Sequence, residues 1–190
     1  MMRFFFTSCF AALLISFGAC KTVERYPDAR TNISLKGKGV LVAAQDRVSA
    51  QPPVENAYRK TAGEAGGSIH VLPLMPAPAL ELPVTAARLG LEKKGTQGLD
   101  PLAQIAMSAV VKGGNRFGVK FDYVLFVTAE KAGSVGQVTN VDHYAALYEI
   151  SSKRVIAAAK ITGTTTAETA LDQLPKGASA VVSLLLDGAD

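Results

Sequence analysis

The feature that most constrains the fold is an uninterrupted apolar run in the second half of the chain. Residues Phe121 to Thr128 read FDYVLFVT, and Val124 to Val127 are apolar without alternation. Successive side chains of a strand point to opposite faces, so such a strand is stable only when both faces are covered. The run therefore predicts a central strand of a sheet that is buried on both sides.

The first half of the chain alternates between strand and helix patterns. Residues 39–45 form a short apolar run, residues 54–65 carry apolar side chains at helical spacing before two glycines, and residues 68–72 form a second run. Strand, helix and strand within about 35 residues is typical of a right-handed crossover between parallel strands.

The second half predicts a helix over 100–112, the central strand, and a hairpin of 144–150 and 154–161 joined at 151–153. Thr165 and Glu168 fit a capping box, and Pro175 is expected to break the helical region that follows. The predicted order is β-α-β-loop-α-β-β-β-α. It indicates a mixed α/β fold, with a single mixed sheet of about five strands and helices packed on it.

A proline-rich loop at 73–98 separates the two halves. Loops longer than about 12–15 residues are uncommon in compact domains and are often functional. This one carries apolar side chains that are candidates for binding a partner: Met75, Leu80, Leu82, Leu89 and Leu91. The alternative is that these side chains fold back as an arm over the sheet of their own domain.

The first 20 residues have the order of a secretory signal. Arg3 supplies a positive charge, an apolar run extends from Phe4 to Gly18, and Ala19 precedes Cys20. A membrane-spanning helix needs about 20 apolar residues, which exceeds this run. We therefore expect residues 1–19 to be a signal peptide.

Residues Phe17-Gly18-Ala19-Cys20 resemble the lipobox of bacterial lipoproteins, with Phe17 where that family usually has leucine. The resemblance implies cleavage between Ala19 and Cys20 and acylation of Cys20, by palmitate or a similar chain. Lys21, rather than aspartate, follows the cysteine, which in that family favours sorting to the outer membrane, facing the periplasm.

Two domain boundaries follow from this reading. Residues 20–34 are polar after the cysteine and lack periodicity, so we expect a lipidated cysteine and a polar tether there. Residues 35–190 are expected to form a single α/β domain. Of the two cysteines, Cys9 would leave with the signal and Cys20 would carry lipid, so packing alone must stabilise the fold.

Neither charge nor polar motifs indicate a reaction. The net charge of +4 is scattered rather than gathered in the stripe of a nucleic-acid-binding protein. His70 is expected to be a packed strand residue. Asp142 and His143 are adjacent on a predicted strand and should point to opposite faces, and the nearest serines, Ser151 and Ser152, fall in a turn. We expect no catalytic residue, no metal and no cofactor.

The order of elements over 39–187 is similar to that of curli-secretion-type and penicillin-binding-protein-activator lipoproteins, and of the N-terminal domain of the Tol–Pal translocation β-propeller protein. The resemblance is topological and has no diagnostic motif. The sequence thus predicts a lipid-anchored envelope protein, not an enzyme, that acts by binding a protein partner or by forming a homo-oligomer. The alternative is a periplasmic small-molecule or cell-wall-binding lipoprotein.

Overall fold

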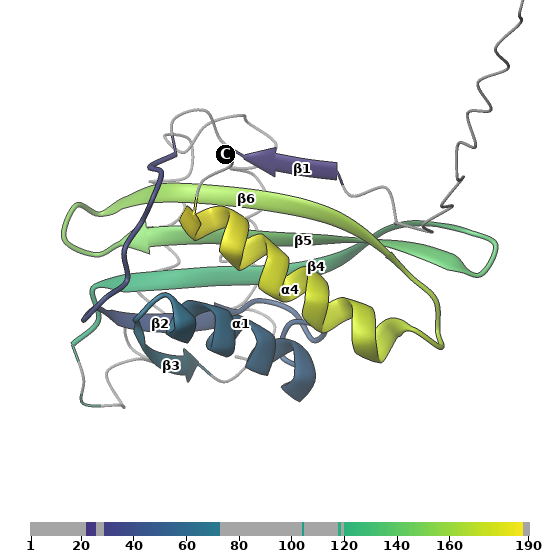
Figure 1. Ribbon diagram of the computed structural model, residues 1–190, viewed down its shortest axis with the longest axis horizontal. Coiled ribbons are helices and arrows are strands. Elements are labelled where there is room, and N and C mark those ends of the chain that lie inside the picture. The colour runs from purple at the N-terminus through teal and green to yellow at the C-terminus, as the bar shows by residue number, and fades with distance from the viewer. Residues whose placement is uncertain (1–21, 26–28, 73–103, 105–117, 119, 188–190) are drawn as a thin grey trace, which may run out of the picture.

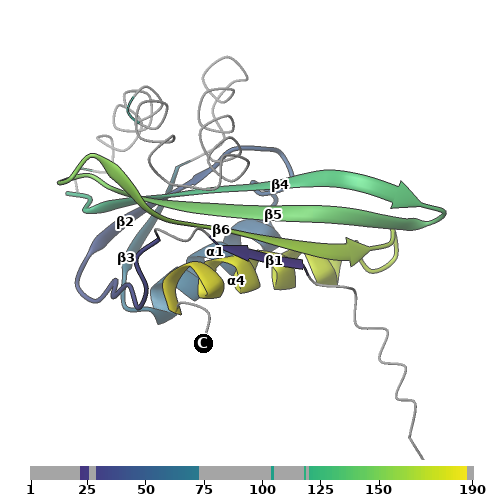
Figure 2. The same cartoon turned by 90° about the horizontal axis from the view of Figure 1, so that it is seen from above.

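The computed structural model describes residues 22–25, 29–72, 104, 118 and 120–187. Their framework is one mixed sheet in the order β1-β6-β5-β4-β2-β3, with helices α1 and α4 side by side on one face (Figures 1 and 2). We call the face under these helices the helix face and the opposite face the second face. The predicted mixed α/β class with a single mixed sheet is confirmed.

The predicted crossover forms the parallel part of the sheet. Strand β2 (Gly39–Ala44) leads into α1 (Pro52–Glu64), and the chain returns through β3 (Ser68–Leu72), which pairs with β2 in parallel. On its other side β2 pairs in parallel with β4 (Tyr123–Val135). Gly39 is needed at this junction, because a Cβ atom there would run into the carbonyl oxygen of Lys120.

The antiparallel part of the sheet is a meander of three long strands. β4 pairs with β5 (Val138–Glu149), and β5 pairs with β6 (Arg154–Thr165), which confirms the hairpin expected across 151–153. β4 and β5 are longer than predicted and form another hairpin that turns at Gly136, whose φ of 60° suits glycine. The sequence signal there is weak because the residues around this turn are mostly exposed.

The central position predicted for the apolar run is confirmed. Val124, Leu125 and Phe126 are each 1% exposed, and Val127 is fully buried. Leu125 and Val127 belong to the cluster under α1 and α4, whereas Val124 and Phe126 belong to a separate cluster on the second face. Both faces of β4 are therefore buried, as a run without alternation requires.

The sixth strand lies in the segment that was expected to be a free tether. β1 (Thr22–Arg25) pairs antiparallel with β6 at the edge of the sheet. Farther along, the Arg30 N–H donates to the Ile156 carbonyl and the Ile33 N–H to the Leu186 carbonyl. This part of the tether prediction is wrong because an edge strand is held by backbone hydrogen bonds, which need no apolar periodicity.

The predicted break at Pro175 is also wrong, since α4 (Ala170–Asp187) runs through the proline as one helix. A proline inside a helix costs about 3 kcal/mol. Beyond it, Val181, Val182, Leu185 and Leu186 are at most 3% exposed, and each gains roughly 1.5–3 kcal/mol by burial. Packing of the last three turns on the sheet therefore outweighs the missing hydrogen bond.

The start of α4 differs from the predicted capping box by one residue. The Thr169 N–H donates to Thr166 Oγ1 at 3.3 Å, and the Thr166 N–H donates to Thr169 Oγ1 at 3.0 Å. This reciprocal pair does what Thr165 and Glu168 were expected to do, with a threonine in place of the glutamate.

Candidate functional site

Asp142 and His143, the pair that most suggested chemistry in the sequence, lie on opposite faces of β5. The His143 ring is 2% exposed and lies against α4 on the helix face, where a Cβ atom added at Gly177 would meet it. Asp142 is 8% exposed and lies on the second face, where it contacts Lys160. Ser151 and Ser152 lie in the turn after β5. The structure therefore does not bring these residues together as a charge relay.

On the helix face, His143 forms part of the floor of a pocket between the sheet and the first half of α4. The floor is buried and also includes Val141 and Ile161. The pocket has a volume of about 140 Å³. A cavity needs only about 10–15 Å³ to hold a water molecule, so this one has room for a larger group.

The walls of this pocket come from two elements. β6 contributes Gly163, Thr164 and Thr165, and α4 contributes Gln173, Leu174, Lys176 and Gly177. Gln173 and Lys176 are exposed and form the rim. A pocket with a buried floor and a polar rim is the common form of a small-ligand site.

The glycines of the pocket have opposite surroundings. A Cβ atom at Gly177 would collide with the His143 ring, so glycine is what allows α4 to approach β5 so closely. A Cβ atom at Gly163 would meet no atom within 4 Å. Gly177 is thus required by packing, whereas Gly163 leaves part of the pocket empty.

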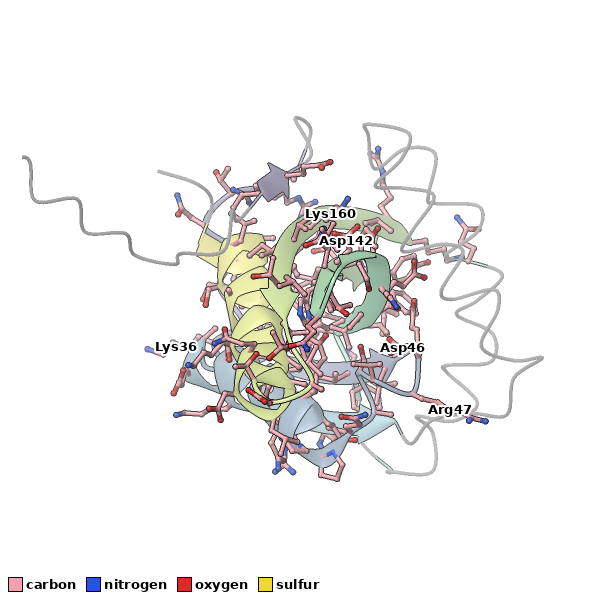
Figure 3. All side chains as sticks on the ribbon, turned by 90° about the vertical axis from the view of Figure 1, so that its right-hand side faces the viewer. Lys36, Asp46, Arg47, Asp142 and Lys160 are labelled. Atoms are coloured by element: carbon pink, nitrogen blue, oxygen red, sulfur yellow. The ribbon has the colours of Figure 1, made fainter. Side chains whose placement is uncertain are left out.

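On the second face, Asp142 is the centre of a polar network between β5 and β6. Asp142 Oδ2 lies 3.0 Å from the Lys160 ammonium and accepts the Tyr144 hydroxyl at 3.2 Å. Asp142 Oδ1 accepts the Thr162 hydroxyl at 2.6 Å. Lys160 also lies 5.5 Å from the centre of the Tyr144 ring, a cation–π contact, and 3.8 Å from Glu24 Oε1 of β1. Figure 3 shows Asp142 next to Lys160.

This network continues as a row of polar side chains across the sheet. The pairing places Thr128 beside Tyr144, Tyr144 beside Lys160, and Lys160 beside Glu24, so that four strands contribute one residue each. Gln45, directly after β2, extends the row, and its N–H donates to the Val127 carbonyl. Ligands of open α/β sheets often bind beyond the carboxyl ends of parallel strands, where Gln45 lies.

Two members of the row have buried polar atoms without a hydrogen bond. Gln45 is 3% exposed and Thr128 is fully buried. Neither polar atom of the Gln45 amide, nor Thr128 Oγ1, has a hydrogen-bond partner in the structure that is described. Such atoms cost about 1–3 kcal/mol each when unpaired, so they mark a place where a polar group or water would bind favourably.

Beside the row, Asp46 fixes the point where the chain leaves the sheet. Its Oδ1 accepts the N–H groups of Val48 and Ser49, and its Oδ2 accepts the Ala129 N–H at 2.8 Å. Ser49 in turn lies 3.3 Å from the hydroxyl of Tyr58 on α1, where burial raises the pKa of that hydroxyl. Asp46 is therefore a structural residue that joins β2, β4 and α1.

The other sequence candidates have structural roles. The His70 ring on β3 stacks edge-on against Phe121, with the ring centres 5.4 Å apart. Gly37, with φ of 70°, turns the chain into β2. Within the described residues, no three histidine, cysteine or acidic side chains come together as a metal site, and no helix is long and apolar enough to cross a membrane.

Several predicted site residues lie outside the described residues: Ala19, Cys20, Met75, Leu80, Leu82, Leu89 and Leu91. The loop at 73–98 and the helix expected over 100–112, apart from residue 104, lie outside them as well. These expectations stay predictions.

Sequence reasoning missed Gln45, Thr128 and Lys160, as well as the pocket. Gln45 and Thr128 are each the polar residue that ends an apolar run, which was the available signal for a polar row at strand ends. The pocket had no such signal, because it depends on how α4 crosses β5 and β6.

An exposed apolar tip lies at the far end of the sheet. The β4–β5 hairpin extends past the start of α4 (Figure 2). At its end Val135 pairs with Val138, and these side chains are 80% and 41% exposed. Leu171, at the start of α4, is 74% exposed. It lies toward the same end, because α4 follows Thr165, which pairs with Thr139. We call Val135 and Val138 the hairpin tip.

No protein-family model and no curated protein sequence matches the chain. Among solved structures, it is similar to the PelC dodecamer from Paraburkholderia phytofirmans, with 17% identity, a TM-score of 0.47, and coverage of 89% of this chain and 99% of that one. A point variant of that dodecamer gives 15% identity, a TM-score of 0.49, and coverage of 88% and 99%. Lipoprotein GNA1162 from Neisseria meningitidis gives 20% identity, a TM-score of 0.37, and coverage of 77% and 96%. At identities this low and TM-scores below one half, these similarities assign neither a family nor a function.

Proposed function

We propose that this chain is a lipid-anchored protein of the cell envelope that acts without catalysis, through association with other proteins, including copies of itself. The observation that carries the proposal is the hairpin tip, which exposes two paired valines at the end of a projecting β-hairpin. Large apolar side chains that project together into solvent are typical of a contact surface, whereas single ones are common anywhere on a protein.

The surroundings of the tip support this proposal. Of the four large apolar side chains that are strongly exposed among the described residues, Val135, Val138 and Leu171 lie toward one end of the sheet, and only Val23 lies elsewhere. β4 also continues past the end of β2, which lies beside Val127, and among the described residues no strand pairs with β4 on that side beyond this point. An open edge can accept a strand from another protein.

Removal of the apolar tip is expected to weaken association without unfolding the domain. In Val135→Ser/Val138→Ser, the substitutions fall on exposed residues and should each change stability by less than about 0.5 kcal/mol. Each lost valine removes roughly 1.5 kcal/mol or more of burial if it is covered in the complex, so affinity should fall at least tenfold. The measurement is crosslinking of the full chain in membranes, followed by separation of the crosslinked species by size.

Val23→Ser is the matched control, because Val23 is a strand valine that is 48% exposed on β1, away from the tip. It should leave the crosslinked species unchanged. Equal crosslinking of the tip variant and the wild type would contradict the role of the tip.

The anchor is tested separately. The lipobox resemblance and the short apolar run before Cys20 support acylation, and two or more acyl chains hold a protein stably on a bilayer. Radiolabelled palmitate should enter the wild-type chain and be lost completely in Cys20→Ser, whereas Cys9→Ser should keep the label on the mature protein. Label that survives Cys20→Ser would overturn the anchor.

A further inference from the structure

We propose that the pocket between α4 and the β5–β6 hairpin binds a small organic anion, a carboxylate carried on a body about the size of a six-membered ring. The proposal goes beyond association through the hairpin tip, and its residues lie on the helix face rather than at the tip. It rests on the volume of the pocket, on the chemistry of its lining and on the open space beside Gly163.

The volume sets the size of the ligand. The pocket measures about 140 Å³, and an enclosed cavity of about 150 Å³ accepts a benzene ring. A single water molecule would fill only a small part of it, whereas a drug-sized molecule would not fit, since sites for those measure roughly 300–1,000 Å³.

The lining sets the chemistry of the ligand. Lys176 and Gln173 offer side-chain hydrogen-bond donors at the rim, and no carboxylate lines the pocket. The acid nearest in sequence to the floor, Asp142, points to the second face, where Lys160 and Thr162 hold it. A pocket whose rim carries one cation and one amide donor, and no anion, favours a ligand with a negatively charged acceptor group.

The apolar part of the lining sets the orientation. Val141 and Ile161 form the buried floor together with His143, and Leu174 faces them from α4. The donors of Lys176 and Gln173 lie at the exposed rim. A ligand would therefore enter with its ring against the floor and keep its carboxylate at the rim, beside Lys176.

Gly163 gives a direct way to close the site. A side chain at this position would project into open space, since a Cβ atom there meets no atom within 4 Å. Gly163 has no positive φ, and its strand β6 accepts β-branched residues. Gly163→Val should therefore fill the pocket and leave the fold intact.

The test uses benzoate as the probe, with benzyl alcohol and acetate as its neutral and ringless counterparts. Binding to the purified full chain in detergent is followed by chemical-shift changes in two-dimensional NMR spectra. We expect benzoate to bind, at least tenfold more tightly than either counterpart, and to shift the amide signals of Gly163, Thr164 and Gly177. Gly163→Val should abolish these shifts while its melting temperature stays close to that of the wild type.

A second variant tests the charge. Lys176→Met keeps the length of the side chain and removes the ammonium, so benzoate should bind about tenfold more weakly, the equivalent of one charge-assisted hydrogen bond at an exposed rim. Failure of benzoate to bind, or binding that survives Gly163→Val, would overturn the site. Equal affinity for benzoate and benzyl alcohol, or no effect of Lys176→Met, would overturn its preference for anions.

Discussion

Replacing Gly177 by valine is expected to lower the free energy of unfolding by about 3 kcal/mol, the upper part of the range for overpacking. Even the first carbon of the new side chain would overlap the His143 ring. The His143 ring is 2% exposed, so a Cβ atom at Gly177 requires either that the ring rotates toward the neighbouring pocket or that α4 moves away from β5. Helix propensity favours valine over glycine by a few tenths of a kcal/mol, which is too little to compensate. Urea unfolding followed by circular dichroism measures the loss.

Gly163→Val is the control for this experiment, since it adds the same side chain to the other wall of the same pocket, where there is space. We expect its stability to remain within about 1 kcal/mol of the wild type. Equal destabilisation by both substitutions would mean that the close approach of α4 to His143 is not what sets the requirement for glycine. A Gly177→Val protein as stable as the wild type would mean the same.

Removal of the Asp142 carboxylate is expected to cost about 2–3 kcal/mol. In Asp142→Ala, the hydroxyls of Tyr144 and Thr162 lose this acceptor, and Lys160 keeps Glu24 Oε1 at 3.8 Å and the Tyr144 ring at 5.5 Å. Breaking a fully buried ion pair costs about 3–5 kcal/mol. The Lys160 side chain is 21% exposed, so its ammonium can turn partly toward water, which places the loss below that range.

Asp142→Asn separates the charge from the hydrogen bonds. The amide oxygen can still accept from Thr162 or Tyr144, so we expect about half of the loss seen for alanine. Asp142→Ala/Lys160→Met also removes the cation that has lost its nearest carboxylate, so the double variant should be more stable than Asp142→Ala alone. Additive losses in this double-mutant cycle would show that the two side chains do not stabilise each other.

The extent to which the sequence predicts this fold depends on the kind of signal each element carries. The run Val124 to Val127 predicted a central strand correctly, because burial on both faces requires an apolar side chain at every position. β1 has no such apolar pattern, since its side chains Val23 and Glu24 are exposed and its stability comes from backbone pairing with β6. The helix break predicted at Pro175 was wrong for a related reason. The local cost of a proline inside a helix was outweighed by the packing of the helical turns that follow it.

In the candidate site, too, features set by local sequence could be predicted, and features set by contacts between distant residues could not. The opposite directions of Asp142 and His143 could be predicted, because they follow from the alternation of a strand alone. The partners of these residues could not: Lys160 and Gly177 lie 18 and 34 positions away from Asp142 and His143 in the printed sequence. Only the strand register and the crossing of α4 bring them together.

The position of β1 has a consequence for how the protein would be mounted. β1 begins at Thr22, two residues after Cys20, and two extended residues span at most about 7 Å. With acyl chains on Cys20, as proposed, almost no linker would separate the lipid from the domain. The edge strand β1 would start at the lipid headgroups. The strands of the meander would then have a fixed orientation relative to the membrane. The direction in which the hairpin tip points would be decided by the angle at which β1 leaves the bilayer.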